Sequence, residues 1–153
     1  MAHQAATIAK ALGKLDADRA DEFERRAEAF AERMKMLDES LNEKLAPYAG
    51  RAFLVYHPAW GYFADDHELR QIAIEVAGQR PTDVEITKAQ RLARREKITT
   101  VFVQPQISDV SARAIAESID GRVVSLNPIE RDVEKNLRAV ADALIESFGP
   151  EDG

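Results

Sequence analysis

A histidine at the end of a predicted buried strand is the residue of this sequence best placed to do chemistry. The apolar run from Phe53 to Tyr56 predicts a strand that delivers His57 to its carboxyl end. Pro58 follows, lacks a backbone donor and keeps His57 out of the α region, so the chain must leave the sheet there. Ligands of open parallel sheets bind outside the carboxyl ends of the strands, so the imidazole is well placed to meet one.

Two later strands are predicted to end in the same way, with a polar residue before a proline. Gln104-Pro105 follows the strand expected at residues 99–103, and Asn127-Pro128 follows the strand expected at 122–126. Because the carboxyl ends of parallel strands meet at one edge of a sheet, we expect His57, Gln104 and Asn127 to line one crevice.

An imidazole beside carboxylate or amide oxygens is a common metal environment. The candidate oxygen donors are Asn127, Glu130, Asp65 and Asp66. The alternative is that His57 is a polar cap on a strand end, bonded to Tyr62 or to a backbone carbonyl. His67, among acidic neighbours, suggests a second metal cluster, but the pattern favours a solvated start of a helix at 65–70.

Alternating strands and helices predict an α/β fold with a four-stranded parallel sheet and helices on both faces. The later strands are expected at 71–76, 99–103 and 122–126, and the later helices at 83–97, 108–119 and 130–148. A short helix over 4–15, ended near Gly13, and a long amphipathic helix from Arg19 to about Pro47 precede the sheet. The predicted domains are the two helices (1–47), a C-terminal α/β lobe (48–149) and a tail (150–153).

Composition excludes several function classes. The net charge of -6 argues against nucleic acid as a partner, and no apolar run is long enough for membrane insertion. The absence of cysteine excludes thiolate nucleophiles, thiolate zinc sites and disulfides. The serines lack a nucleophile-elbow context and no glycine-rich loop could cradle a phosphate, so we expect no enzyme. We also expect no signal peptide in this chain.

With these residues in place, the sequence resembles the periplasmic zinc- and manganese-binding solute receptors of bacterial ABC importers over about residues 4–148. Four segments carry the resemblance: Ile8–Asp16, Phe53–Asp66, Val101–Gln106 and Val123–Pro128. In that family a rigid long helix joins two α/β lobes, and the metal lies between the lobes. The resemblance implies that only the linking helix and the second lobe are present here, and that the N-terminal lobe is missing.

The resemblance also implies a role for His57 as the metal-binding histidine of the second lobe. The family's other ligand in this lobe is usually an aspartate before the last strand's proline, where this chain has Asn127. An amide is a poorer zinc ligand than a carboxylate, so either affinity is reduced or Glu130 or Asp132 substitutes. His67 replaces an aromatic residue of the family pattern, and its role stays open.

These observations predict a metal-binding lobe whose cargo is zinc, with manganese as the alternative, and whose parent protein serves an importer permease from the periplasm. The rival hypothesis is a metal-free interaction or regulatory module derived from such a receptor. Without a first lobe, apolar side chains such as Ile8, Phe23 and Phe30 should be uncovered, which predicts a homodimer through the long helix.

Overall fold

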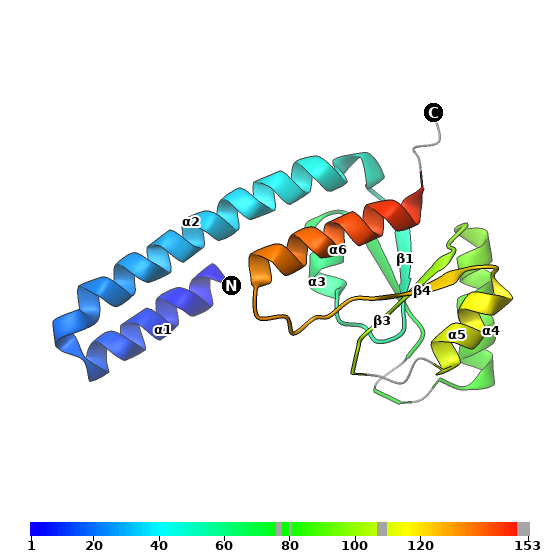
Figure 1. Cartoon of the computed structure of the whole chain (residues 1–153), viewed down its shortest axis with the longest axis horizontal. Coiled ribbons are helices and arrows are strands. Elements are labelled where there is room, and N and C mark those ends of the chain that lie inside the picture. The colour runs from blue at the N-terminus through cyan, green and yellow to red at the C-terminus, as the bar shows by residue number, and fades with distance from the viewer. Residues whose placement is uncertain (76–77, 80, 107–109, 150–153) are drawn as a thin grey trace. The chain divides into compact units, whose positions relative to one another are not determined.

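The computed structural model describes residues 1–75, 78–79, 81–106 and 110–149. The chain divides into two compact units, Met1–Glu43 and Lys44–Gly153 (Figure 1). The predicted domain boundary at residue 48 stays a prediction, and the predicted tail lies outside the described residues.

The first unit is built from α1 (Ala2–Leu15), a 3₁₀ turn (Ala17–Arg19) and most of α2 (Ala20–Leu45). Gly13 does not end α1, as the sequence suggested, because the helix continues to Leu15. Its role is packing: a Cβ at Gly13 would lie 3.2 Å from the Cβ of Ala20, at the start of α2. A larger residue would therefore push the two helices apart.

The second unit contains a parallel sheet of β1 (Ala52–Val55), β2 (Arg70–Ala73), β3 (Thr100–Val103) and β4 (Arg122–Ser125). The strand order is β2-β1-β3-β4, so β1 pairs with strands on both sides. The connections run through α3 (Gly61–Asp66), α4 (Asp83–Arg95) and α5 (Val110–Ser118), and α6 (Val133–Phe148) follows β4. The predicted four-stranded parallel sheet, preceded by a long helix, is confirmed.

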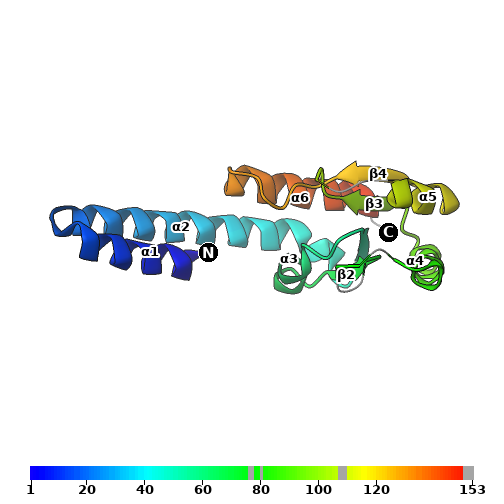
Figure 2. The same ribbon diagram turned by 90° about the horizontal axis from the view of Figure 1, so that it is seen from below.

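Alternate side chains of the strands pack on opposite faces of the sheet. Leu54 and Val101 belong to a buried cluster that includes residues of α4 and α5, such as Ala93 and Ile115. The next side chains along, Phe53 and Phe102, are also buried, and their rings meet edge to face with centroids 6.3 Å apart. Figures 1 and 2 show α4 and α5 on one side of the strands and α6 on the other. The period of two therefore gives helices on both faces, as predicted.

The helix predicted at 65–70 is wrong in position, because α3 spans Gly61–Asp66. The pair Asp65-Asp66 suggested a helix start, but it closes the helix instead. Burial of Phe63 and Ala64 places the helix earlier, and Glu68 then adopts a left-handed conformation with φ of 56°. Arg70 was predicted to be helical, but it is the first residue of β2 and pairs with Ala52.

The other boundaries differ by smaller amounts. Strand β2 ends at Ala73, so the strand predicted at 71–76 is too long, and its last residue lies outside the described residues. The N-cap predicted at Ser108 also lies outside them. Helix α6 begins at Val133, not at Glu130, because the side chain of Asp132 accepts a hydrogen bond from the Lys135 amide and caps the helix.

Local interactions define the start of α4. The Thr82 side chain accepts a hydrogen bond from the Glu85 amide, and the Glu85 carboxylate accepts one from the Thr82 amide. Together these two hydrogen bonds make a capping box. The Thr82 amide and the Thr82 hydroxyl both donate to the Glu85 carboxylate, and these two hydrogen bonds lower the pKa of Glu85. In the part of the chain that the structure describes, no helix is both long enough and apolar enough to cross a bilayer.

We expect Gly121→Ala to destabilise the second unit. A Cβ at this position would lie 2.2 Å from the carbonyl oxygen of Thr99, so the backbone before β3 or β4 would have to move. Overpacking of this kind costs about 1 to 3 kcal/mol. Urea unfolding followed by the fluorescence of Trp60, the single tryptophan, measures the loss.

Gly61→Ala is the matched control. Its Cβ would meet only the Gln71 side chain at 3.7 Å, an ordinary contact, and alanine favours the helix in which it lies. A Gly121→Ala protein as stable as this control would contradict the close approach.

Candidate functional site

The carboxyl ends of the four strands bring four polar residues to one edge of the sheet. In strand order from β2 to β4, these residues are Glu75, His57, Gln104 and Asn127. Sequence reasoning predicted the last three and missed Glu75, because it looked for a polar residue before a proline. The strand register in the structure locates Glu75. Val55 pairs with Ala73, so the residues two positions later, His57 and Glu75, fall side by side.

The backbone around His57 is fixed on both sides. Tyr56 donates its amide to Phe102 O at 2.8 Å, and its carbonyl accepts the Glu75 amide at 2.9 Å. Beyond Pro58, the Ala59 amide donates to His57 O at 2.9 Å. The Trp60 amide then donates to the side-chain oxygen of Gln71 at 2.8 Å. The histidine therefore lies in a turn that is tied at both ends.

The imidazole of His57 pairs with a carboxylate. Its Nδ1 lies 2.9 Å from Oε2 of Glu75, and the two side chains are 38% and 11% exposed. Tyr62, one of the two partners considered under the alternative of a polar cap, is 90% exposed. Trp60 and Phe63 are buried and close the core. Because Glu75 engages Nδ1, the nitrogen left for a ligand is Nε2.

His67 is not part of a solvated helix start, which corrects the sequence-based expectation. It is 6% exposed, and its ring packs edge to face on Phe63 with centroids 4.6 Å apart. Its amide closes the last turn of α3 on the carbonyls of Phe63 and Ala64. The neighbouring Asp65 and Asp66 are exposed.

Asn127 lies in a hydrogen-bonded loop after β4. Its Oδ1 accepts from Gln106 Nε2 at 3.1 Å and from the Ile129 amide at 3.2 Å, while its Nδ2 donates to Glu130 Oε2 at 3.3 Å. Its carbonyl accepts from the Asn136 side chain at 2.8 Å. The predicted oxygen donors Asn127 and Glu130 are therefore adjacent, and each is engaged in this loop.

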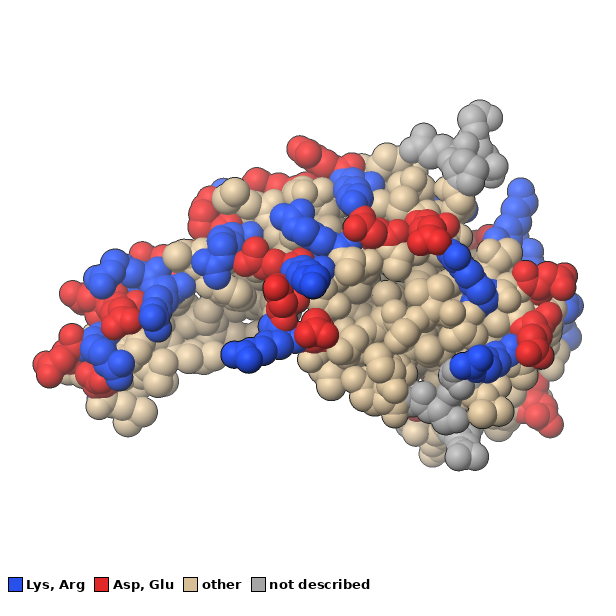
Figure 3. Space-filling view, viewed as in Figure 1, with Lys and Arg blue, Asp and Glu red and all other residues tan. Residues whose placement is uncertain are grey.

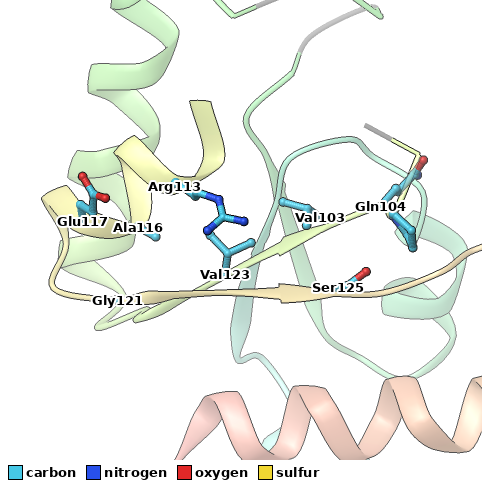
Figure 4. Close-up of a pocket in the computed structure, with 9 residues that line it drawn as sticks. Val103, Gln104, Arg113, Ala116, Glu117, Gly121, Val123 and Ser125 are labelled. Carbon is cyan, nitrogen blue, oxygen red and sulfur yellow. The ribbon is translucent and has the colours of Figure 1, made fainter. Parts of the chain in front are cut away.

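Gln104 borders a separate pocket of about 460 Å³ between α5 and the strands β3 and β4. Figure 4 shows Arg113 of α5 above Val123, with Gln104 and Ser125 at the other end of the pocket. Among the described residues, no hydrogen bond joins His57 to Gln104 or Asn127. A crevice shared by all three stays a prediction.

The described residues contain no group of three or more His, Asp or Glu side chains able to hold a metal ion. The surface near the sheet carries apolar side chains instead: Tyr62 is 90% and Ile129 is 74% exposed. Figure 3 shows few charged side chains over β3 and β4 on the face of the second unit that it presents. A single imidazole at the edge of such a lobe could supply one metal ligand, with the others coming from elsewhere.

An open parallel sheet with polar groups at its carboxyl edge is typical of α/β domains that bind small ligands. The family model for the zinc-uptake complex component A, a periplasmic protein, matches residues 1–147. The chain belongs to this family of zinc-uptake substrate-binding proteins. Its members bind a substrate and are not enzymes, which confirms the expectation of no enzyme.

Three similar proteins illustrate the relationship. The crystal structure of ZnuA is 39% identical, with a TM-score of 0.92 over 96% of this chain and 56% of that one. The laminin-binding protein of Streptococcus agalactiae is 26% identical, with a TM-score of 0.87 over 96% and 60% of the two chains. The zinc-binding protein AdcA of Streptococcus pyogenes is 26% identical over 88% of this chain and 27% of its own length. The chain thus spans little more than half of its solved relatives.

We expect Asn127→Asp to lower the free energy of unfolding by about 0.5 to 1 kcal/mol at neutral pH. The new carboxylate still accepts from Gln106 and Ile129, but its second oxygen replaces the Nδ2 that faces Glu130 at 3.3 Å. Two carboxylates would then repel each other. Urea unfolding of the single variants and of Asn127→Asp with Glu130→Gln gives the coupling. Equal losses with and without the Glu130 charge would contradict the pairing.

Proposed function

We propose that this chain is the C-terminal lobe, with its linking helix, of a zinc receptor that serves an ABC importer, and that His57 is the metal ligand of this lobe. The observation that carries the proposal is the position of His57. It lies partly exposed at the carboxyl edge of the sheet, in a chain that belongs to the zinc-uptake family. The intact receptor would hold the ion between this lobe and a first lobe.

The ligand chemistry favours zinc over manganese. An imidazole suits zinc, whereas manganese prefers carboxylate, carbonyl and water oxygens. Within this chain Asn127 and Glu130 are the weaker ligand candidates. The atom of Asn127 that would bind metal, Oδ1, already accepts hydrogen bonds from Gln106 and Ile129. Because a zinc site needs about four ligands, the isolated chain should bind zinc weakly, with water completing the shell.

The proposed partner of the intact receptor is the importer's permease, and its proposed compartment is the periplasm, as for the family. Binding and release of the ion, without covalent chemistry, would constitute the activity. This chain would contribute one wall of the metal site and the apolar surface around it, where Tyr62 and Ile129 are exposed.

We expect His57→Ala to weaken zinc binding by this chain at least about tenfold, since the loss of one ligand should exceed about 1.4 kcal/mol. Competition with a coloured zinc chelator measures the affinity. His3→Ala is the matched control, because it also removes one imidazole but changes an exposed residue of α1 in the other unit. Equal zinc affinities of wild type and His57→Ala would contradict the assignment of His57 as a zinc ligand.

A second candidate function is a metal-free interaction module. Two observations favour it: an amide stands at position 127, and its oxygen already accepts two hydrogen bonds. The similar protein of Streptococcus agalactiae is described as having adhesin as well as metal-transporting activity. The zinc titration separates the two functions, since a module of this kind would bind zinc no better than its His57→Ala variant.

We further propose that two copies of this chain pair through the helices of the first unit. Ile8, Leu12 and Leu15 recur at helical spacing along α1 and are 59%, 39% and 85% exposed. Burying such a side chain stabilises by about 1.5 to 3 kcal/mol, so a second copy of the same stripe is a suitable cover. Phe23 and Phe30 are only half-buried, with the guanidinium groups of Arg19 and Arg33 over their rings.

We expect Ile8→Glu to shift this chain towards the monomer at least about tenfold in dissociation constant, because it places a charge in the apolar seam. Sedimentation or light scattering over a dilution series provides the measurement. Lys10→Gln is the control, as it makes the same change of net charge at an exposed position of α1, two residues from Ile8 and therefore on another face of the helix. A wild-type chain that stays monomeric at high concentration would contradict the pairing.

A further inference from the structure

Glu75 is a mostly buried carboxylate beside the proposed zinc ligand, and the zinc proposal as stated gives it no role. We propose that Glu75 is a positioning residue, which holds the proton of His57 on Nδ1 and so presents Nε2 to the zinc ion. The part of this inference that concerns zinc affinity rests on the proposed function. The arrangement of Glu75 and His57 can be tested without metal.

The backbone fixes Glu75 in this place. Strand β2 pairs with β1 in register from Ala52 to Val55, and the ladder continues past the strands. The Ile74 amide donates to Val55 O at 3.0 Å and the Glu75 amide donates to Tyr56 O at 2.9 Å. Residue 75 therefore stands beside residue 57 because of the sheet itself, and only side-chain rotation remains to be set.

Burial then determines which group holds the proton. The Glu75 side chain is 11% exposed, and its Oε2 lies 2.9 Å from Nδ1 of His57. An ionised carboxylate can only accept hydrogen bonds, so the imidazole must donate through Nδ1. A carboxylate shielded from water needs such a donor, since leaving it unpaired costs more than an ordinary hydrogen bond contributes. In the tautomer that carries its proton on Nδ1, the imidazole keeps the lone pair of Nε2 available.

This arrangement suits a metal ligand for two reasons. The carboxylate selects the tautomer and limits rotation of the ring, so less order is lost when the ion binds. It also makes the imidazole a stronger donor to the metal. Removal of such a partner typically lowers metal affinity by about 10-fold to 100-fold. Glu75 would act through His57 and would not touch the ion.

The test compares Glu75→Gln with wild type in the metal-free protein and with zinc. Long-range nitrogen–proton NMR of isotope-labelled histidine reports the tautomer at about pH 9, where an ordinary imidazole is neutral. His57→Ala identifies the signal among the three histidines. We expect wild type to show one form with the proton on Nδ1, and Glu75→Gln to show both forms, because an amide can donate as well as accept.

Zinc affinity is measured on the same proteins by chelator competition, and we expect Glu75→Gln to lose about 10-fold or more. Glu68→Gln, which removes one exposed charge from the same unit, is the control and should bind as wild type does. A tautomer unchanged in Glu75→Gln would overturn the inference, as would an equal loss of affinity in Glu68→Gln. If wild type and His57→Ala bind zinc equally, the proposed function fails, while the tautomer spectra still decide the role of Glu75.

Discussion

The pairing of β1 with strands on both sides is the constraint on which the rest of the second unit depends. Because the backbone of Tyr56 is bonded to Phe102 on one side and Glu75 on the other, the next residue leaves the sheet at a defined point. A shift of one residue would exchange the side chains of the two buried faces, which pack against different helices, so the register is strongly specified. The position of His57 is therefore a property of the whole sheet.

The same constraint explains the connection between β1 and β2. Register pairs Ala52 with Arg70, which leaves the intervening residues to form a turn and one short helix. The Gln71 side chain accepts a hydrogen bond from the Trp60 amide, and the rings of Phe63 and His67 pack against each other. Aromatic burial thus positions the turn that carries His57, and it gives the second histidine of this segment a place in the core.

The two sides of the sheet edge differ in their chemistry. At β1 and β2 an imidazole meets a carboxylate, an arrangement suited to supporting a metal ligand. At β4 an amide, Asn127, binds the loop around it through Gln106, Ile129 and Glu130. The chain belongs to the zinc-uptake family, yet one of its candidate ligands, Asn127, is neutral and already hydrogen-bonded.

The sequence by itself determined the fold class, the succession of helices and strands along the chain and the place of His57 just after β1, because strand periodicity and proline placement are local signals. It misplaced α3, since Asp65 and Asp66 suit either end of a short helix until burial of Phe63 decides between them. It missed Glu75, because no local pattern marks a residue whose partner is 18 positions away. Only the tertiary structure decided that contact, through the hydrogen-bonded register that sets one strand beside another.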